Sequence, residues 1–285
     1  MHIFRNLIFI LLLGLNLISC SSMISSATNK MAKNLSSAIT NNDDLATVKA
    51  GAPAYLLMLD SFVEGDPDDS SMQIAAAKLY SAYAGVFVKD EERAKRLTQK
   101  SLDFALQANC LVDKTRCNLK TMKFKSFEKI IEQFEKEHLN LLFTLGTSWA
   151  GWIQSRPGDW DAAADLGRVT KIMKHALKLD EKFQSGQIHL YLGVLNTLLP
   201  PALGGKPEIG KKHFERAINL SNNKNLMAKV IYAEKYARLV FNQELHDKLL
   251  TSVLNTEPRS KGFTLTNMLA HEQAKSLLQS GKDYF

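Results

Sequence analysis

The histidine and carboxylate residues of this 285-residue chain do not match a complete catalytic or metal-binding motif. His271-Glu272 begins like the helix of a zinc protease, but Lys275 stands where the second histidine ligand is required. Residues 146–150 resemble the nucleophile elbow of hydrolases, yet they lie within a predicted helix that no strand precedes. His213 is interpreted as a partly exposed helix residue. We expect a protein that is not an enzyme and uses neither a metal nor a cofactor. A hydrolase with an unrecognised site is an alternative.

A cluster of aromatic residues is the best candidate for a binding site. Trp149 and Trp152 are three residues apart, so they share one face of a predicted helix, and Arg156 follows one turn later. Such a cluster could line a pocket with apolar walls and one cation for a carboxylate. Tyr191 and Asn196 lie in the corresponding helix of the next predicted pair and would face the same groove. The alternative is that the tryptophans pack in the core, where aromatic side chains are common.

The first 20 residues predict an exported, lipid-anchored protein. Arg5 precedes an apolar run that is too short to span a bilayer, and the run closes on Leu17-Ile18-Ser19-Cys20. This ending resembles the bacterial lipobox, which predicts a signal peptide at residues 1–19 and fatty acylation (palmitate) of Cys20. Ser21-Ser22 follows without an acidic residue, which favours the outer membrane. The alternative is an ordinary signal peptide with a cysteine there by chance.

Two cysteines remain after this cleavage, Cys110 and Cys117, with six residues between them. An exported compartment permits disulfides, and the intervening residues are polar and typical of a turn. We therefore predict a disulfide that closes a small loop between two helices. A pair of buried free thiols is the alternative, and the lack of a histidine nearby in the sequence argues against a zinc site.

The composition suits one large domain or two small ones. Removal of residues 1–19 takes away one basic and no acidic residue, so the net charge falls from +7 to +6. The hydrophobic content of 45% suffices for a core. Lysines are spread along the chain, without a run long enough to form a nucleic-acid-binding arm. We expect instead a basic surface that faces anionic lipid headgroups or an anionic ligand.

Apolar residues recur at helical spacing along almost the whole chain, without a convincing alternating strand. Residues 20–42 are interpreted as a lipid-anchored N-terminal segment, either an amphipathic helix over 23–40 or a loose tether. A helical domain is expected at 43–285, with Pro53 at a helix start and a kink at Gly167. The helices predicted in this domain span residues 45–64, 72–87, 91–107, 124–138, 139–154, 160–179, 187–198, 208–220, 225–240, 243–255 and 264–280.

The predicted helices form pairs with short turns, which suggests tetratricopeptide (TPR) repeats of about 34 residues. Residues 211–220 look like the second helix of such a repeat, and residues 170–179 echo them 41 positions earlier. Leu145-Gly146 and Leu192-Gly193, 47 positions apart, echo the first helix, where a small residue lets neighbouring helices approach closely. The period is irregular. We therefore predict an all-α fold of stacked antiparallel helix pairs, with degenerate TPR-like repeats and a concave binding face.

Several stretches, in order along residues 45–285, resemble the T-component, the lipoprotein associated with tripartite ATP-independent periplasmic (TRAP) transporters. The sequence departs from the family pattern at Lys206, where relatives more often carry an acidic residue. The stretches that carry the resemblance are Ala50 to Asp60, Tyr80 to Phe87, Arg93-Ala94-Lys95, Trp149, Trp152, Ala164-Asp165-Leu166, Gly204-Gly205, His213 to Ala217, Lys229 to Ala233 and the tail Asp283-Tyr284-Phe285.

This resemblance implies an all-helical cryptic TPR fold, a lipid anchor on the periplasmic face of a bacterial membrane, and association with an extracytoplasmic solute-binding protein. It also implies a small homo-oligomer, a trimer. We therefore expect an accessory lipoprotein of a TRAP transporter that docks the solute-binding protein and takes a small organic acid in its own groove. The alternative is a TPR lipoprotein that scaffolds envelope or outer-membrane assembly and binds polypeptide.

Overall fold

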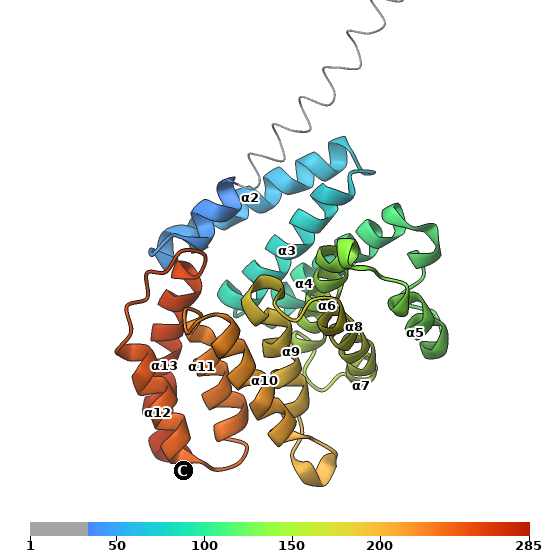
Figure 1. Cartoon of the computed structure of the whole chain (residues 1–285). Coiled ribbons are helices and arrows are strands. Elements are labelled where there is room, and N and C mark those ends of the chain that lie inside the picture. Colours follow the sequence, from blue (N-terminus) through green and yellow to red (C-terminus); the bar gives the residue numbers. More distant parts are fainter. Residues whose placement is uncertain (1–33) are drawn as a thin grey trace, which may run out of the picture. The chain divides into compact units, whose positions relative to one another are not determined.

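The computed structural model describes residues 34–285 and divides the chain into two units, Met1–Thr40 and Asn41–Phe285 (Figure 1). In the first unit the described residues, 34–40, are helical. Cys20 and most of the predicted N-terminal helix lie outside the described residues. All regular elements of the second unit are helices, and residues 34–285 contain no strand. The predicted all-α fold class is confirmed.

Twelve α-helices form the second unit, and most begin and end within a few residues of the positions expected from the sequence. Short 3₁₀ turns lie in several connections, and Ala233–Ala237 continues α11 as a π-helix. The helices are α2 (Leu45–Gly65), α3 (Ser70–Phe87), α4 (Glu91–Val112), α5 (Phe124–Glu132), α6 (Leu139–Gln154), α7 (Trp160–Ala164), α8 (Leu166–Leu179), α9 (Gln187–Thr197), α10 (Pro207–Leu220), α11 (Leu226–Tyr232), α12 (Gln243–Leu254) and α13 (Thr264–Tyr284).

Acidic side chains determine where several of these helices begin. The Asp44 carboxylate accepts hydrogen bonds from two amides in the first turn of α2. Asp69, Asp90 and Asp159 cap α3, α4 and α7 in the same way. The first amides of a helix have no partner within it, so a side-chain oxygen before the first turn stabilises the start. Asp90 stands directly before residue 91, where the sequence analysis placed the start of a helix, and that start is confirmed.

Some predicted boundaries were wrong. Pro53 lies inside α2 and not at a helix start, because the Asp44 cap begins the helix two turns earlier. The helix predicted at 160–179 breaks at Asp165 instead of kinking at Gly167. The Asp165 carboxylate contacts residues of other elements at this break, and such contacts cannot be recognised in the local sequence.

The ends of three other helices also differ from those expected. The helix predicted at 124–138 ends at Glu132, and Phe134 then turns into the core, where it is almost fully buried. Helix α4 continues five residues beyond Gln107, to Val112, and α13 continues to Tyr284. These ends depend on the tertiary packing of the side chains around them. Packing lengthens α4 and α13 and shortens α5 relative to the local sequence pattern.

Neighbouring helices pack side by side and bury a continuous apolar core along α3, α4, α6 and α8. Leu102, Phe127, Leu142, Trp149 and Ile172 are fully buried members of this core. Two further clusters fill the space between α11, α12 and α13 and the space around Phe214 of α10. Burial of apolar side chains is the main favourable contribution to folding, so these stacked faces hold the unit together.

Two glycines allow close helix contacts. A Cβ on Gly146 of α6 would lie 2.7 Å from Ile172 Cγ2 of α8. A Cβ on Gly193 of α9 would lie 2.5 Å from Phe214 Cε1 of α10. These are the two glycines that the sequence analysis placed in the first helices of repeats, and both lie at helix–helix contacts. The assignment of the helix pairs as TPR-like repeats stays a prediction.

A disulfide joins Cys110 and Cys117, whose Cα atoms are 4.2 Å apart. Cys110 lies in the last turn of α4, and Cys117 directly follows a 3₁₀ turn, Lys114–Arg116. The bond therefore closes a small loop at the end of α4. It holds this end of the helix beside the segment that leads to α5.

Candidate functional site

Trp149 of α6 is fully buried. Its indole Nε1 donates a hydrogen bond to Asp165 Oδ2 at 3.0 Å. Its ring makes an edge-to-face contact with the ring of Phe127, with the centroids 5.9 Å apart. A buried indole needs a hydrogen-bond acceptor and finds one inside the protein, so Trp149 packs in the core and lines no open surface.

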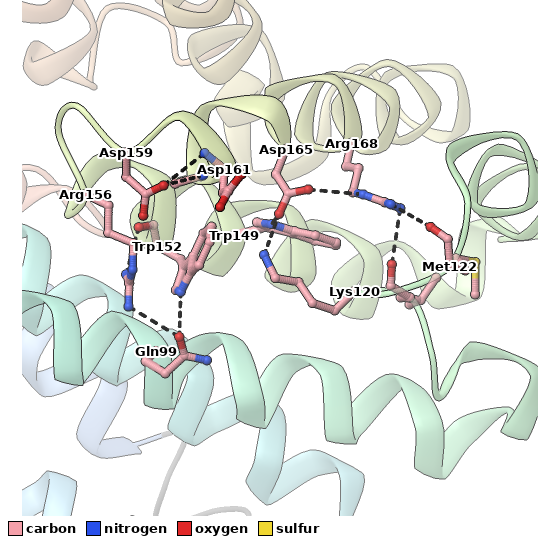
Figure 2. A network of polar contacts seen from close by, with 12 residues as sticks. Gln99, Lys120, Met122, Trp149, Trp152, Arg156, Asp159, Asp161, Asp165 and Arg168 are labelled. Carbon is pink, nitrogen blue, oxygen red and sulfur yellow. Dashed lines mark hydrogen bonds and ion pairs between the residues drawn. The ribbon is translucent and has the colours of Figure 1, made fainter.

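The Asp165 carboxylate is the centre of a polar network around Trp149 (Figure 2). Its Oδ2 accepts hydrogen bonds from Trp149 and from Lys120 Nζ, and its Oδ1 accepts one from Arg168 Nε at 3.2 Å. Arg168 also donates to two backbone carbonyls in the segment before α5, at 3.3 and 2.6 Å. The network ties this segment to the start of α8, so its role is structural.

Trp152 is partly exposed and faces α4. Its indole Nε1 donates a hydrogen bond to Gln99 Oε1 at 2.6 Å (Figure 2). Lys120 Nζ lies 3.5 Å from the ring centroid, and the guanidinium carbon of Arg156 lies 4.5 Å from it. Cations are attracted to the face of an indole, so this ring helps to hold two positive charges at the edge of the core.

Arg156 has several hydrogen-bond acceptors, but it forms no ion pair with a carboxylate of residues 34–285. Its guanidinium donates to Trp152 O at 3.0 Å, to Ser155 Oγ at 2.9 Å and to Gln99 Oε1 at 3.3 Å, and all three acceptors are neutral. Partial burial lowers the pKa of the Arg156 guanidinium from its usual value, yet arginine stays charged at neutral pH. Its positive charge is therefore fixed in place, without a direct counter-charge from the part of the chain that the structure describes.

An open hollow of about 350 Å³ lies beside Arg156, on one face of α4. Two of its cations have acidic partners, since Lys95 pairs with Glu92 at 2.8 Å and Lys100 pairs with Asp60 at 2.6 Å. Within the described residues Arg96 forms no ion pair, so its guanidinium is available to a ligand. The hollow therefore carries an excess of positive charge and suits a small anion. Its lining residues are Lys95, Arg96, Gln99, Lys100, Asp103 and Arg156.

Tyr191 and Asn196 of α9 do not line this hollow. The Tyr191 ring contacts the ring of Phe143 edge to face, with the centroids 5.7 Å apart, and burial raises the pKa of Tyr191 to about 12. Asn196 Nδ2 donates to Leu192 O, one turn earlier in its own helix, at 2.7 Å. The structure thus brings together Trp152 and Arg156, places Trp149 behind them in the core, and leaves Tyr191 and Asn196 elsewhere.

A second cluster of titratable groups lies between α9 and α10. His189 Nδ1 and His213 Nδ1 are 2.8 Å apart, so one ring donates a hydrogen bond to the other. Burial lowers the pKa of His213 to about 4, and it also lowers the pKa of His189. Glu181 approaches His189 Nε2 at 3.3 Å and accepts two hydrogen bonds from Arg216, which depress its pKa to about 2. Because burial lowers both pKa values, the neutral form of the two imidazoles is favoured.

The motifs that resembled catalytic signatures have structural surroundings. His271 Nε2 lies 3.0 Å from the carbonyl oxygen of Thr256, and Gly146 lies inside α6 against α8. Across residues 34–285, no group of three or more His, Cys, Asp or Glu side chains is arranged to hold a metal ion. No helix in that range is both long enough and apolar enough to cross a membrane.

The sequence analysis missed three features of this region. The Asp165 network and the His189–His213 pair join residues that are distant along the chain, so no local sequence motif indicates that they are in contact. The cations on α4 had a usable signal, because Arg96 and Lys100 are four residues apart and therefore share one helix face. Nothing in that spacing connects them to Arg156, which is 57 residues from Gln99.

Comparison with models of protein families gives a match over most of the chain. Residues 41–285 match the family model described as TRAP transporter T-component (TAtT). Among curated proteins, no sequence matches the chain. The matched range begins where the second structural unit begins, at Asn41, and both continue to the C-terminal residue.

Proposed function

The chain belongs to the TRAP transporter T-component family, an accessory component of TRAP transporters, and we propose that it docks the solute-binding protein of its transporter. The observation that carries this proposal is the family match over the whole of the second unit, residues 41–285. Membership also points to an extracytoplasmic location in a bacterium. In this role the protein acts as a non-enzymatic partner, and the membrane transporter supplies the energy for uptake.

The anchor belongs to the same proposal. After removal of residues 1–19, acylated Cys20 holds the protein on the periplasmic face of the outer membrane, and residues 20–42 connect this anchor to the helical domain. More than one acyl chain is needed for stable anchoring, because a single chain binds a membrane only reversibly. The protein assembles into a small homo-oligomer, which its resemblance to the T-component family implies is a trimer.

The hollow on α4 is the proposed site for a small organic acid. Arg96 forms no ion pair with residues 34–285, and the fork of donors on its guanidinium matches the two oxygens of a carboxylate. Arg156 adds a fixed positive charge, and Trp152 supports two of the lining residues, because its indole donates to Gln99 and its ring lies under Arg156. Because the hollow is open to solvent, salt screens these charges, and binding should weaken as the ionic strength rises.

Titration calorimetry tests both parts of this function. Purified solute-binding protein from a TRAP transporter of the same organism is titrated into the mature protein, with and without candidate mono- and dicarboxylates. We expect direct binding of the two proteins, and binding of at least one organic acid to this protein alone. Arg96→Ala and Arg156→Ala should each lower the affinity for the organic acid about tenfold or more. The reason is that a hydrogen bond to a charged group contributes about 1.5–3 kcal/mol.

Lys125→Ala is the matched control, because it removes one exposed positive charge from α5, outside the hollow. It should leave organic-acid binding unchanged. If both arginine variants bind the acid like the wild type, the hollow is not the site, although docking of the solute-binding protein would stand. If the wild-type protein does not bind the solute-binding protein, the docking proposal fails and a scaffold for envelope assembly becomes the better hypothesis.

A further inference from the structure

The connection between α9 and α10, residues 198–206, is an unusually apolar exposed segment. We call it the α9–α10 loop. From Leu198 to Gly205 it contains no polar side chain, and Leu198, Leu199 and Leu203 are exposed. Leu203 keeps 67% of its surface in solvent, and the exposed side chain of Ile209 follows in the first turn of α10. Contiguous exposed apolar surface in a soluble domain commonly marks an interaction site.

The backbone of this loop is held in a defined shape. Pro200 and Pro201 restrict φ, and Pro200 O accepts hydrogen bonds from Leu203 N at 2.9 Å and from Gly205 N at 3.1 Å. Gly204 has φ +87°, and a Cβ on Gly205 would lie only 1.6 Å from Leu199 O, so both positions require glycine. Because the loop is already ordered, a partner that binds it spends little free energy on ordering it.

The charges next to the loop indicate what kind of surface fits it. Lys206 and Lys212 are exposed, and Lys211 lies 6.0 Å from the ring centroid of Tyr236. Glu208 is the acidic residue of this segment, and its carboxylate already accepts a hydrogen bond from Tyr236 Oη at 2.7 Å. An apolar projection with cations at its base is complementary to an apolar recess with an acidic rim.

The position of the loop favours a protein partner over the anchoring membrane. The chain enters the second unit at α2, and Figure 1 shows the α9–α10 loop (gold) at the opposite edge of that unit. In a protein tethered through the residues before α2, the loop therefore lies on a different edge of the unit from the one that the tether joins. A two-fold contact between two copies of this loop is less suitable, because identical loops facing each other would bring like charges together.

We propose that the α9–α10 loop inserts into an apolar recess with an acidic rim on the solute-binding protein. This inference rests on the proposed function and specifies the surface that performs the docking. Leu199 and Leu203 supply the apolar contact, and Lys206 supplies the charge at its edge. The loop is separate from the hollow on α4, so one protein can hold its partner and an organic acid at different places.

Calorimetric titration of the solute-binding protein into matched variants tests the surface. Leu203→Ser should weaken binding at least tenfold, because the change removes a large apolar side chain whose burial in the recess contributes to affinity and puts a polar hydroxyl in its place. Leu57→Ser is the control, since Leu57 of α2 is 69% exposed and lies away from the loop. It should leave the affinity unchanged. Lys206→Glu should weaken binding and reduce its dependence on salt. Thermal melting of each variant checks that the fold is intact.

The outcomes separate the surface from the function. If the wild-type protein binds and Leu203→Ser binds equally well, the loop is not the docking surface, although docking itself stands. If the wild-type protein does not bind, both proposals fail. Flotation with vesicles of phosphatidylethanolamine and phosphatidylglycerol tests the alternative that the loop binds a lipid membrane. A loss of vesicle binding in Leu203→Ser, with unchanged affinity for the solute-binding protein, would overturn the inference and assign the loop to the membrane.

Discussion

At the scale of single residues, burial separates tryptophans that lie close together in the sequence. Trp149 is fully buried and bonded to Asp165, Trp152 lies at the edge of the core, and Trp160 is 87% exposed. Only an edge position offers both a supported ring and access to a ligand. Trp152 therefore stays a candidate for binding, whereas Trp149 supports it from behind.

Trp149→Ala should lower the free energy of unfolding by about 3–5 kcal/mol, as large-to-small changes in a core do. The change opens a cavity next to Phe127, and Asp165 loses one of its three side-chain donors. Trp160→Ala should change the free energy by less than about 0.5 kcal/mol, because that side chain is largely exposed. Urea unfolding followed by circular dichroism measures both. Equal losses for the two variants would contradict the burial of Trp149 and the exposure of Trp160.

At the scale of elements, α9 and α10 form a tightly packed pair. Gly193 lets the ring of Phe214 lie directly against α9, and the His189–His213 hydrogen bond lies in the same interface. A pair of imidazoles 2.8 Å apart needs an unprotonated nitrogen as the acceptor. Protonation of both rings removes this acceptor and places two positive charges in contact, so the stability of the pair depends on pH.

Acid should destabilise the protein through this pair. The folded pKa of His213 is about 4, below the value of about 6.5 in an unfolded chain. Between these values the unfolded state binds more protons, so the free energy of unfolding rises with pH. The contribution is fully present above about pH 6.5 and is lost as the pH falls towards 4. Because His213 is partly exposed, we expect about 1–2 kcal/mol, less than the full shift implies.

Urea unfolding at a series of pH values measures this effect. His213→Gln has no titrating ring at this position, so its stability should change less than that of the wild type between pH 6.5 and 4. His175→Gln is the control, because His175 contacts the carbonyl oxygen of Phe134 and lies outside the α9–α10 interface. If His213→Gln follows the wild-type pH profile, the histidine pair does not control acid stability.

At the scale of the whole molecule, the second unit and the family match share the range 41–285. The chain enters this unit beside the segment that precedes α13, where Asn41 Oδ1 accepts a hydrogen bond from Gly262 N at 2.7 Å and Asp43 pairs with Arg259 at 2.9 Å. These contacts fasten the start of the unit to its last helices. The proposed membrane attachment lies before this point, so anchoring should depend on the N-terminal segment and not on the helical unit.

Cys20→Ala should leave the protein unprocessed, or released from the membrane as a soluble protein, because acylation there is its proposed hold on the bilayer. Labelling of cells with a radioactive fatty acid, followed by membrane fractionation, measures this. Cys110→Ser together with Cys117→Ser is the control, since the disulfide lies within the helical unit and the double variant should still be labelled. Label that survives Cys20→Ala would show that another residue carries the lipid.

The sequence by itself determined the helices, because helix formation depends on local information. Apolar spacing marks the buried face, and capping residues such as Asp69 and Asp90 satisfy amides within their own first turn. Prediction failed where a distant contact overrides the local pattern. At Asp165, for example, the carboxylate meets Trp149 and Lys120 and the helix breaks. The family also follows from the sequence alone, since its pattern runs along the whole domain.

Only the tertiary structure decided which predicted residues share a site. The sequence does not distinguish Trp149 from Trp152. The packing of α4, α7 and α8 around α6 buries Trp149 and leaves Trp152 at the edge of the core. The same packing brings Gln99 of α4 beside Arg156 and leaves Tyr191 in contact with Phe143. These relations depend on how helices rotate and stack against one another. A single helix does not encode that rotation, because each contact needs residues from two elements that fold together.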